Sequence, residues 1–305
     1  MSTQRVLITG AATGMGALAA TSLARSGHTV FASMRDPGNR NAPAAEVLLA
    51  SAAGAPGSIS VIELDVLSQE SADRAVDAAV AAAGGIDVVV HNAAHLLFGV
   101  TEAFSAEEVI RAFDINAVGA LRVNRAVLPH MRRAGSGLLL WNGSGTTRAI
   151  PPFLGPYTAA KAAFDAFAES TAWDVAVYGI ETTILMPGVF THGTAHFAKA
   201  AVPADQARTD EYELLAPFLA SSAEDTERLM VGDVTADPQI VADEIVRIVG
   251  LPRGQRPRRA VADDSDYGAE ILNGAAEELR LRLARRMGIM SLTELADPNA
   301  QEVSA

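Results

Sequence analysis

The stretch of sequence that decides the fold is residues 5–16, RVLITGAATGMG. An apolar strand breaks into a turn with three glycines, and an alanine-rich helical stretch follows. Strand, glycine-rich turn and helix in this order are the context in which a glycine pattern predicts a dinucleotide-binding site. Gly10 permits a tight turn, Gly14 leaves room for a pyrophosphate, and Gly16 lets the helix pack close to the sheet. The helix would then offer free N–H groups and a partial positive charge to the phosphates.

Strands and helices alternate along the rest of the chain. Short apolar runs predict strands at residues 28–33, 59–64, 86–90, 138–141, 181–185 and 259–262. Helical spacing predicts helices at residues 44–51, 68–83, 106–132, 157–178, 239–249 and 268–286. This alternation indicates an α/β fold, a doubly wound parallel sheet of the Rossmann type with helices on both faces.

The domain organisation follows from the same pattern. No linker or repeat divides the chain, so residues 1–305 are expected to form a single domain. The pattern loosens at residues 191–237, which either cover the substrate or merely pack on the surface. The tail at residues 297–305 is expected to be disordered.

Composition excludes several classes of function. The formal net charge is −12 and no long basic run occurs, which argues against nucleic acid as a partner. There are no cysteines, and the six histidines lack ligand-like spacing, so no metal site is expected. No apolar run nears the roughly 18 residues of a membrane span, and no signal segment opens the chain. A cytoplasmic protein with no membrane partner is therefore expected.

Small and polar residues recur where the predicted strands end. Asp65 follows the third strand, Asn92 the fourth and Ser144 the fifth, and residues 187–191 follow the sixth. Ligands of doubly wound sheets bind beyond the carboxyl ends of the strands. The convergence of these residues on the edge that holds the glycine turn is stronger evidence than any single motif.

Tyr157 and Lys161 form the candidate chemical centre. They lie four residues apart, and so on one face of the predicted helix. An ammonium beside a phenol favours the phenolate and lowers the tyrosine pKa from its reference of about 10, as general acid-base catalysis needs. Ser144 could hold a substrate oxygen beside the phenol. Taken alone, however, the pair could equally be an ordinary surface pair, and Asn116 in mid-helix could be a tolerated polar residue.

Together these residues resemble the short-chain dehydrogenase/reductase family, of the compact single-domain kind. Ser144 precedes Tyr157 by 157 − 144 = 13 residues, which is the family's usual interval. The resemblance covers about residues 5–191 well and the remainder loosely. It is carried by Thr9-Gly10-x-x-x-Gly14-x-Gly16, Asp65, Asn92-Ala93, Asn116, Ser144, Tyr157-x-x-x-Lys161, Pro187-Gly188 and Thr191.

The resemblance implies an NAD(P)-dependent oxidoreductase that interconverts a ketone or aldehyde and an alcohol. Tyr157 would exchange the proton with the substrate oxygen, and Ser144 would hydrogen-bond that oxygen. Lys161 would lower the tyrosine pKa and bind the nicotinamide ribose, while Asn116 would hold a water that links Lys161 to solvent.

The resemblance also implies where the cofactor lies. Asp65 and Asn92 would contact the adenosine side, and Thr191 would contact the nicotinamide carboxamide. The residues expected to bind the cofactor are Gly10, Thr13, Gly14, Met15, Gly16, Arg35, Asp65, Val66, Asn92, Ala93, Tyr157, Lys161, Pro187, Gly188, Val189 and Thr191.

The end of the second strand bears on the choice between NADP(H) and NAD(H). An NAD site usually places an acidic residue there, whereas Met34 stands at about that position and Arg35 follows it. An arginine suits a 2′-phosphate, so NADP(H) is favoured. NAD(H) stays possible, because a small shift of the chain would turn Asp36 toward the ribose. The stretch 33–37 resembles family members that act on steroid-like or other bulky ketones.

Two departures from the family pattern are visible. The family usually has Asn-Asn-Ala-Gly where this chain has His91-Asn92-Ala93-Ala94, and Gly143 replaces a serine before Ser144. Ala94 in place of glycine removes backbone freedom there, which would shift the nearby substrate wall. Neither departure removes a residue expected to take part in catalysis.

Two other classes of function remain in view. One is a nucleotide-sensing regulator that keeps the fold without chemistry, which has no need for the whole set of Asn116, Ser144, Tyr157 and Lys161. The other is a structural or interaction protein, which the glycine turn disfavours. The family usually associates through its two long helices, here about 106–132 and 158–178, so a homodimer or homotetramer with two-fold symmetry is expected.

Overall fold

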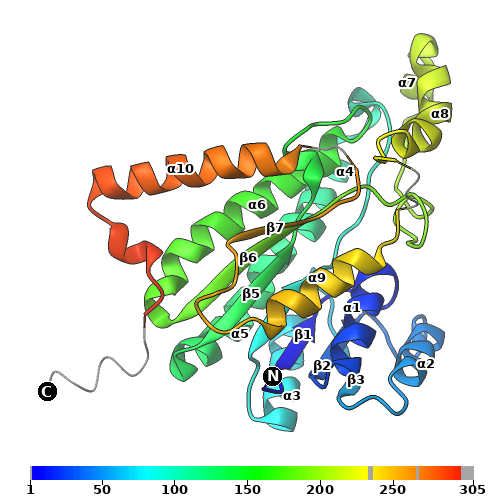
Figure 1. Cartoon of the computed structure of the whole chain (residues 1–305). Helices are drawn as coiled ribbons and strands as arrows, with labels where there is room; N and C mark the ends of the chain where they lie inside the picture. Colours follow the sequence, from blue (N-terminus) through cyan, green and yellow to red (C-terminus); the bar gives the residue numbers. More distant parts are fainter. Residues whose placement is uncertain (1, 233–235, 266–267, 297–305) are drawn as a thin grey trace, which may run out of the picture.

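The computed structural model describes residues 2–232, 236–265 and 268–296. The tail predicted at residues 297–305, and residues 233–235 of the predicted covering segment, lie outside these ranges. The predicted fold is confirmed: a seven-stranded sheet has the order β3-β2-β1-β4-β5-β6-β7, and every neighbouring pair is parallel (Figure 1). The strands are β1 Arg5–Ile8, β2 Thr29–Met34, β3 Ser58–Glu63, β4 Val88–His91, β5 Gly137–Asn142, β6 Ile180–Pro187 and β7 Arg259–Ala262.

The order in which strands are added to the sheet reverses between β1 and β4. Val6 of β1 pairs with Val30 of β2 on one side and with Val88 of β4 on the other. The chain winds outward from β1 in both directions, so the crevice at the carboxyl ends of β1 and β4 is the place where this fold binds ligands. The glycine turn follows β1 at that point.

Helices cover both faces of the sheet (Figure 1). One apolar core lies under α1 Gly14–Arg25, α2 Ala42–Ser51 and α9 Gln239–Gly250. The other lies under α3 Gln69–Ala83, α5 Gly119–Ala134 and α6 Gly155–Val175. The helix α10 Ala269–Met287 runs beside α6 at the edge of the molecule (Figure 1). Single turns of 3-10 helix occur at Thr101–Ala103, Gly145–Thr147, Ala176–Tyr178, Glu213–Leu215 and Met290–Thr293.

The helix predicted at residues 106–132 is interrupted. It comprises α4 Ala106–Phe113, a π-helical turn Asp114–Val118, and α5. Asn116 lies in the middle of the π turn and is 1% exposed. Turns of this kind are rare and often mark functional sites. The interruption explains how an asparagine, which is a poor residue for a helix interior, stands in this position.

Two helices of the segment after β6 lie at the surface along their whole length. The helices α7 Gln206–Asp210 and α8 Ala216–Glu227 contain no buried residue. Figure 1 shows both standing away from the sheet, above the edge at which the strands end. Among the helices of the described ranges, none is both long and apolar enough to cross a membrane.

Candidate active site

A cavity of about 1100 Å³ opens at the carboxyl edge of the sheet. Fifteen of the predicted site residues line it: Gly10, Thr13, Gly14, Met15, Arg35, Asp65, Val66, Asn92, Ala93, Ser144, Tyr157, Lys161, Pro187, Gly188 and Val189. The remaining three predicted residues, Gly16, Asn116 and Thr191, do not line it. The strand ends therefore bring most of the predicted set to one place.

The glycine turn is shaped by close backbone contacts. Gly10 has φ +69°, and a Cβ there would lie 2.8 Å from the Cα of Ala93. A Cβ on Gly16 would lie 2.5 Å from the side-chain nitrogen of Asn92 and 2.6 Å from the backbone oxygen of Gly10. Gly16 thus makes room for the Asn92 amide within the turn. The sequence predicted only that Gly16 lets the helix pack close to the sheet.

Asn92 lines the cavity and is also hydrogen-bonded within the protein. Its Nδ2 donates to the backbone oxygens of Thr9 at 3.0 Å and Gly10 at 3.2 Å. Its Oδ1 accepts from Nδ2 of Asn142 at 3.0 Å. These bonds give Asn92 a bracing role in the wall of the cavity, and its contact to adenosine stays a prediction.

The first turn of α1 is open to an anion. Thr13 stands at its N-cap but makes no capping hydrogen bond through its side chain, and the first turn has no acidic residue. By contrast, Ser68 caps α3, and Ser105 with Glu108 forms a complete capping box on α4. The first N–H groups of a helix need partners, so α1 presents free donors beside Gly14 at the cavity.

Tyr157 and Lys161 lie in the first two turns of α6 and are both buried, 6% and 3% exposed. Nζ of Lys161 donates to the backbone oxygen of Asn142 at 2.9 Å and lies 4.8 Å from the ring centroid of Phe164. Burial lowers the pKa of Lys161 to about 8. A cation of reduced basicity thus sits one helical turn from the phenol, which rules out an ordinary surface pair.

Ser144 follows β5 and faces the same cavity. Its hydroxyl shares a hydrogen bond of 2.9 Å with the hydroxyl of Thr146, and it accepts from the Thr146 backbone N–H at 3.3 Å. Sequence reasoning did not identify Thr146 or Asn142, although both lie within two residues of Ser144. Their roles depend on contacts that the pattern of residue types does not encode.

Asn116 acts through the backbone of His95. Its Oδ1 accepts from the His95 N–H at 2.8 Å, and its Nδ2 donates to the His95 oxygen at 2.9 Å. These two bonds join the π turn to the segment after β4. The Asn116 side chain is not part of the cavity lining. If Asn116 holds a water that leads to Lys161, the backbone of the π turn would have to bind that water.

The end of β2 carries two cations at the cavity. Arg35 and Arg40 both line it, and neither forms a salt bridge within the described residues, although the charge of Arg40 lies near enough to Asp36 to help lower the pKa of that carboxyl. Asp36 does not line it. The Asp36 carboxylate accepts from Nδ2 of Asn39 at 2.9 Å and from the Arg40 N–H at 3.2 Å, bonds that lower its pKa. Sequence reasoning missed Arg40, five residues beyond Arg35.

The segment after β6 departs from prediction at Thr191. The Thr191 hydroxyl donates to Glu227 at 3.0 Å, away from the cavity lining. Thr194 lines the cavity instead, and its Cβ is 3.6 Å from where a Cβ on Gly14 would lie. The loop after residue 190 has no regular secondary structure. The distance in sequence from the Pro187-Gly188 motif therefore does not determine which threonine faces the cavity.

The far part of the cavity is largely apolar. Its aromatic walls come from three loops and from α8, and comprise Phe98, Phe153, Phe190, Phe197 and Phe218. His196 lies edge-on to Tyr157, with ring centroids 5.7 Å apart. Burial, with the nearby charges of Lys161 and His95, lowers the His196 pKa to about 4, so this ring is neutral at physiological pH.

A group of buried charges backs the site. Nε of Arg148, four residues after Ser144, donates to Asn273 of α10 at 2.9 Å, and its Nη2 reaches Asp165 of α6 at 3.3 Å. Arg259 of β7 binds both oxygens of Asp165 at 2.8 and 2.9 Å. Burial alone would raise the pKa of Asp165, but the two guanidiniums hold it below its usual value. The Ser144 loop is thereby tied to α6, β7 and α10.

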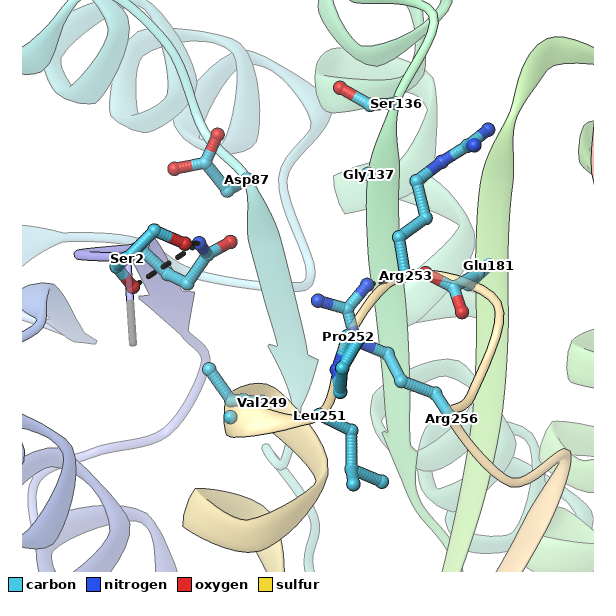
Figure 2. A pocket seen from close by; sticks show the side chains of 12 residues that line it. Ser2, Asp87, Ser136, Gly137, Glu181, Val249, Leu251, Pro252, Arg253 and Arg256 are labelled. Atoms are coloured by element: carbon cyan, nitrogen blue, oxygen red, sulfur yellow. Dashed lines mark hydrogen bonds and ion pairs between the residues drawn. The ribbon is translucent and has the colours of Figure 1, made fainter. Parts of the chain in front are cut away.

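A second cavity, of about 460 Å³, lies at the opposite edge of the sheet, where the strands begin (Figure 2). Figure 2 shows the side chains of Asp87, Glu181 and Arg256 around it. Asp87 is paired with Arg5 and Glu181 with Arg256, so these charges satisfy one another. Within the described ranges, no group of three or more His, Asp or Glu side chains could hold a metal ion.

Comparison with known proteins agrees with this geometry. The family model described as short chain dehydrogenase matches residues 4–202. An uncharacterized oxidoreductase, YusZ of Bacillus subtilis, is 31% identical over 81% of this chain and 85% of its own length. Retinol dehydrogenase 8 of Bos taurus is 32% identical over 83% of this chain and 80% of its own length.

A solved structure supports the same conclusion over 96% of the chain. A short-chain dehydrogenase from Streptomyces avermitilis superposes with a TM-score of 0.72 at 25% identity, covering 96% of this chain and 99% of that one. The family match extends through the glycine turn, Ser144, Tyr157 and Lys161. The chain belongs to the short-chain dehydrogenase/reductase family and is an oxidoreductase of alcohol and carbonyl groups.

Proposed function

We propose that the protein interconverts a bulky, apolar ketone and the matching secondary alcohol, with NADP(H) as its cofactor and Tyr157 as the acid-base. The observation that carries the proposal is the burial of Tyr157 and Lys161 together in the wall of the large cavity, with Ser144 lining the same wall. Burying an ammonium costs free energy that a single hydrogen bond to a backbone oxygen only partly offsets, so its presence in the wall points to a functional role. Here its position beside a phenol supplies one.

The chain has the features that a nicotinamide dinucleotide requires. The uncapped first turn of α1 offers donors for the pyrophosphate. The carboxylate of Asp65 and the side chain of Val66 line the cavity on the adenosine side. The side-chain oxygen of Asn142, which also lines the cavity, is buried without a hydrogen-bond partner within the described residues. When bound, the nicotinamide supplies or accepts the hydride.

The proton is handled by the protein. The Lys161 cation stabilises the phenolate form of Tyr157, so the phenol can give a proton to a carbonyl oxygen or take one from an alcohol near neutral pH. Ser144 donates a hydrogen bond to the same oxygen and orients it. Asn116 stabilises the arrangement from behind, because it fixes the backbone of His95 in the cavity wall.

Two features favour NADP(H). Arg35 and Arg40 face the cavity and form no salt bridge within the described residues, so together they can bind a 2′-phosphate through charge-assisted hydrogen bonds. The competing residue, Asp36, is engaged in the turn that follows it. A carboxylate held in that way is poorly placed to accept a bond from a ribose hydroxyl.

The walls of the cavity favour a bulky apolar substrate. Five phenylalanines and several aliphatic side chains surround the space beyond Tyr157. Phe218 of α8 and Phe197 come from residues 191–237, which supports the role of this segment as a cover over the substrate. The related retinol dehydrogenase is named for a large apolar alcohol, which is consistent with such walls.

The decisive experiment is a substrate panel followed at the absorbance of the reduced nicotinamide. Large apolar ketones and alcohols are compared with short-chain analogues, each with NADP(H) and NAD(H). We expect turnover with the large substrates and a preference for NADP(H). Tight cofactor binding with no turnover on any member would favour the nucleotide-sensing alternative, and the absence of cofactor binding would contradict both.

A further inference from the structure

We propose that the outer face of α10 binds α10 of a second copy of this chain, in an antiparallel pair about a two-fold axis near Leu279. This contact is separate from the association expected through residues 106–132 and 158–178, and it does not depend on the proposed chemistry. It rests on the exposed side chains of α10, on the order of its charges, and on its attachment to the body.

The outer face of α10 carries an apolar stripe. Its large side chains are Ile271, Leu272, Leu279, Leu283 and Met287, which are 79%, 48%, 54%, 53% and 60% exposed. At 100° per residue Leu272, Ala276, Leu279, Leu283 and Met287 fall within about a quarter of the helix circumference, and Arg282 and Arg286 lie on the flank that carries Ile271 and Ala275. A monomeric protein rarely leaves so continuous an apolar surface in water.

The opposite face of α10 is firmly attached to the protein. Ala269, Asn273 and Ala284 are buried, and Asn273 bonds Arg148. The guanidinium of Arg280 lies 5.1 Å from the ring centroid of Trp173 of α6. Since these contacts fix which way the helix is rotated, the apolar stripe cannot turn inward to be buried by its own chain.

The residues of the stripe are self-complementary in an antiparallel pair. A two-fold axis at Leu279 places each residue opposite the residue that lies equally far from Leu279 in the other direction, so the two residue numbers add up to 558. Leu279 then meets its own copy, Leu283 meets Ala275, and Ile271 meets Met287, while Ala276 meets Arg282 and Leu272 meets Arg286. Large side chains thus face small ones next to the centre, which allows helices to approach to about 8–10 Å.

Charge selects the antiparallel direction and the occupant. Glu278 precedes the midpoint on one flank of the stripe, and Arg282 follows it on the same flank. Neither has an ion-pair partner within the described residues. An antiparallel pair brings Glu278 of each copy beside Arg282 of the other, and symmetry repeats the contact. A parallel two-fold pair would instead place the two copies of this flank on opposite sides of the pair, where Glu278 and Arg282 could not meet.

A membrane surface is the competing occupant of an apolar helix face. Four arginines lie in the second half of α10, but Glu270, Glu277 and Glu278 lie in the first half. Anionic lipid would repel that half, whereas an antiparallel second copy accommodates both. The chain as a whole also carries a net charge of −12, which disfavours an anionic lipid surface.

The absence of cysteine from the chain permits a direct test. In Leu279→Cys each chain has a single thiol, so any disulfide or bis-maleimide link must join two copies. We expect rapid formation of a covalent dimer at micromolar concentration. The matched control is Val47→Cys, on α2 and 71% exposed, which should cross-link at least about tenfold more slowly. Equal rates for the two variants would overturn the proposal.

Charge reversal tests the orientation in a background without added thiols. Glu278→Arg and Arg282→Glu should each raise the dissociation constant measured by analytical ultracentrifugation, by about tenfold for two symmetric exposed pairs. The double variant should restore association. A double variant as weak as the single ones would overturn the antiparallel arrangement. A membrane is the occupant instead if three results coincide. The protein cosediments with phosphatidylserine vesicles, Leu279→Asp abolishes this cosedimentation, and Leu279→Cys does not cross-link.

Discussion

Nζ of Lys161 lies 2.9 Å from the backbone oxygen of Asn142, and this hydrogen bond joins α6 to the end of β5. The same asparagine donates through its side chain to Asn92, which in turn binds the backbone of the glycine turn. A continuous set of hydrogen bonds therefore runs from the Lys161 cation to the turn after β1. The proposed proton chemistry and the proposed cofactor cradle share one framework.

Replacement of Tyr157 by phenylalanine tests the assigned acid-base. Tyr157→Phe keeps the ring and its packing but removes the proton, so turnover should fall at least about 10²-fold. Cofactor affinity, measured by fluorescence quenching, should change little. The matched control is His196→Phe, which keeps an aromatic ring beside Tyr157 and should lose far less activity. A larger loss of turnover in His196→Phe than in Tyr157→Phe would assign the acid-base role to His196.

The buried cation should make stability depend on pH. The folded-state pKa of Lys161 is about 8, below its usual 10.5. Between these values the unfolded chain binds more protons than the folded chain, so folding is increasingly favoured as the pH rises from about 8 to 10.5. Lys161→Met removes this contribution.

Urea unfolding of the two proteins measures the effect. Lys161→Met should be inactive, yet its free energy of unfolding at pH 7 should be at least that of the wild type. As the pH rises to 10, the free energy of unfolding of the wild type should increase relative to that of Lys161→Met. A difference that is independent of pH would show that burial does not perturb this group.

Cofactor choice should depend on two arginines. Arg35→Ala should lower the ratio of kcat/KM for NADP(H) over NAD(H) by about ten- to a hundred-fold, since a charge-assisted contact contributes roughly 1.5–3 kcal/mol. Arg40→Ala should act in the same direction, because this side chain lines the same cavity. Asp36→Asn is the control and should leave the ratio unchanged. A ratio that moves with Asp36 rather than with the arginines would reverse the assignment to NAD(H).

The Gly16 contact predicts a steric effect on cofactor binding. In Gly16→Ala the new methyl group meets the Asn92 amide and the Gly10 oxygen. Displacement of these groups should weaken cofactor binding at least about tenfold, and overpacking of this kind typically costs about 1–3 kcal/mol of stability. Gly38→Ala serves as the control, because no atom lies within 4 Å of a Cβ at that position. Calorimetric titration of both variants with NADP(H) measures the difference.

The parts of the site that the sequence predicted are those governed by local pattern. The glycine turn, the strand ends and the Tyr157–Lys161 spacing all follow from periodicity and from the rule that parallel strands end at one edge. Thr191 departed from prediction because an irregular loop intervenes. Asn142 was missed because its role arises from contacts with segments distant in sequence, and Arg40 because only the turn after β2 brings it to the cavity beside Arg35. Asn116 required a π turn that helical propensity does not indicate.

The buried charges behind Ser144 have a consequence for how the molecule opens. Arg148, Asp165 and Arg259 are each less than 15% exposed, and with Asn273 they bond four separate elements to one another. Removal of Asp165 would leave Arg148 without an acidic partner in a largely buried environment. The elements β7 and α10, which lie beyond the family match, are therefore expected to unfold together with α6. Amide hydrogens in α6, β7 and α10 should exchange with deuterium together, as one cooperative unit, and at rates far below those of α7 and α8.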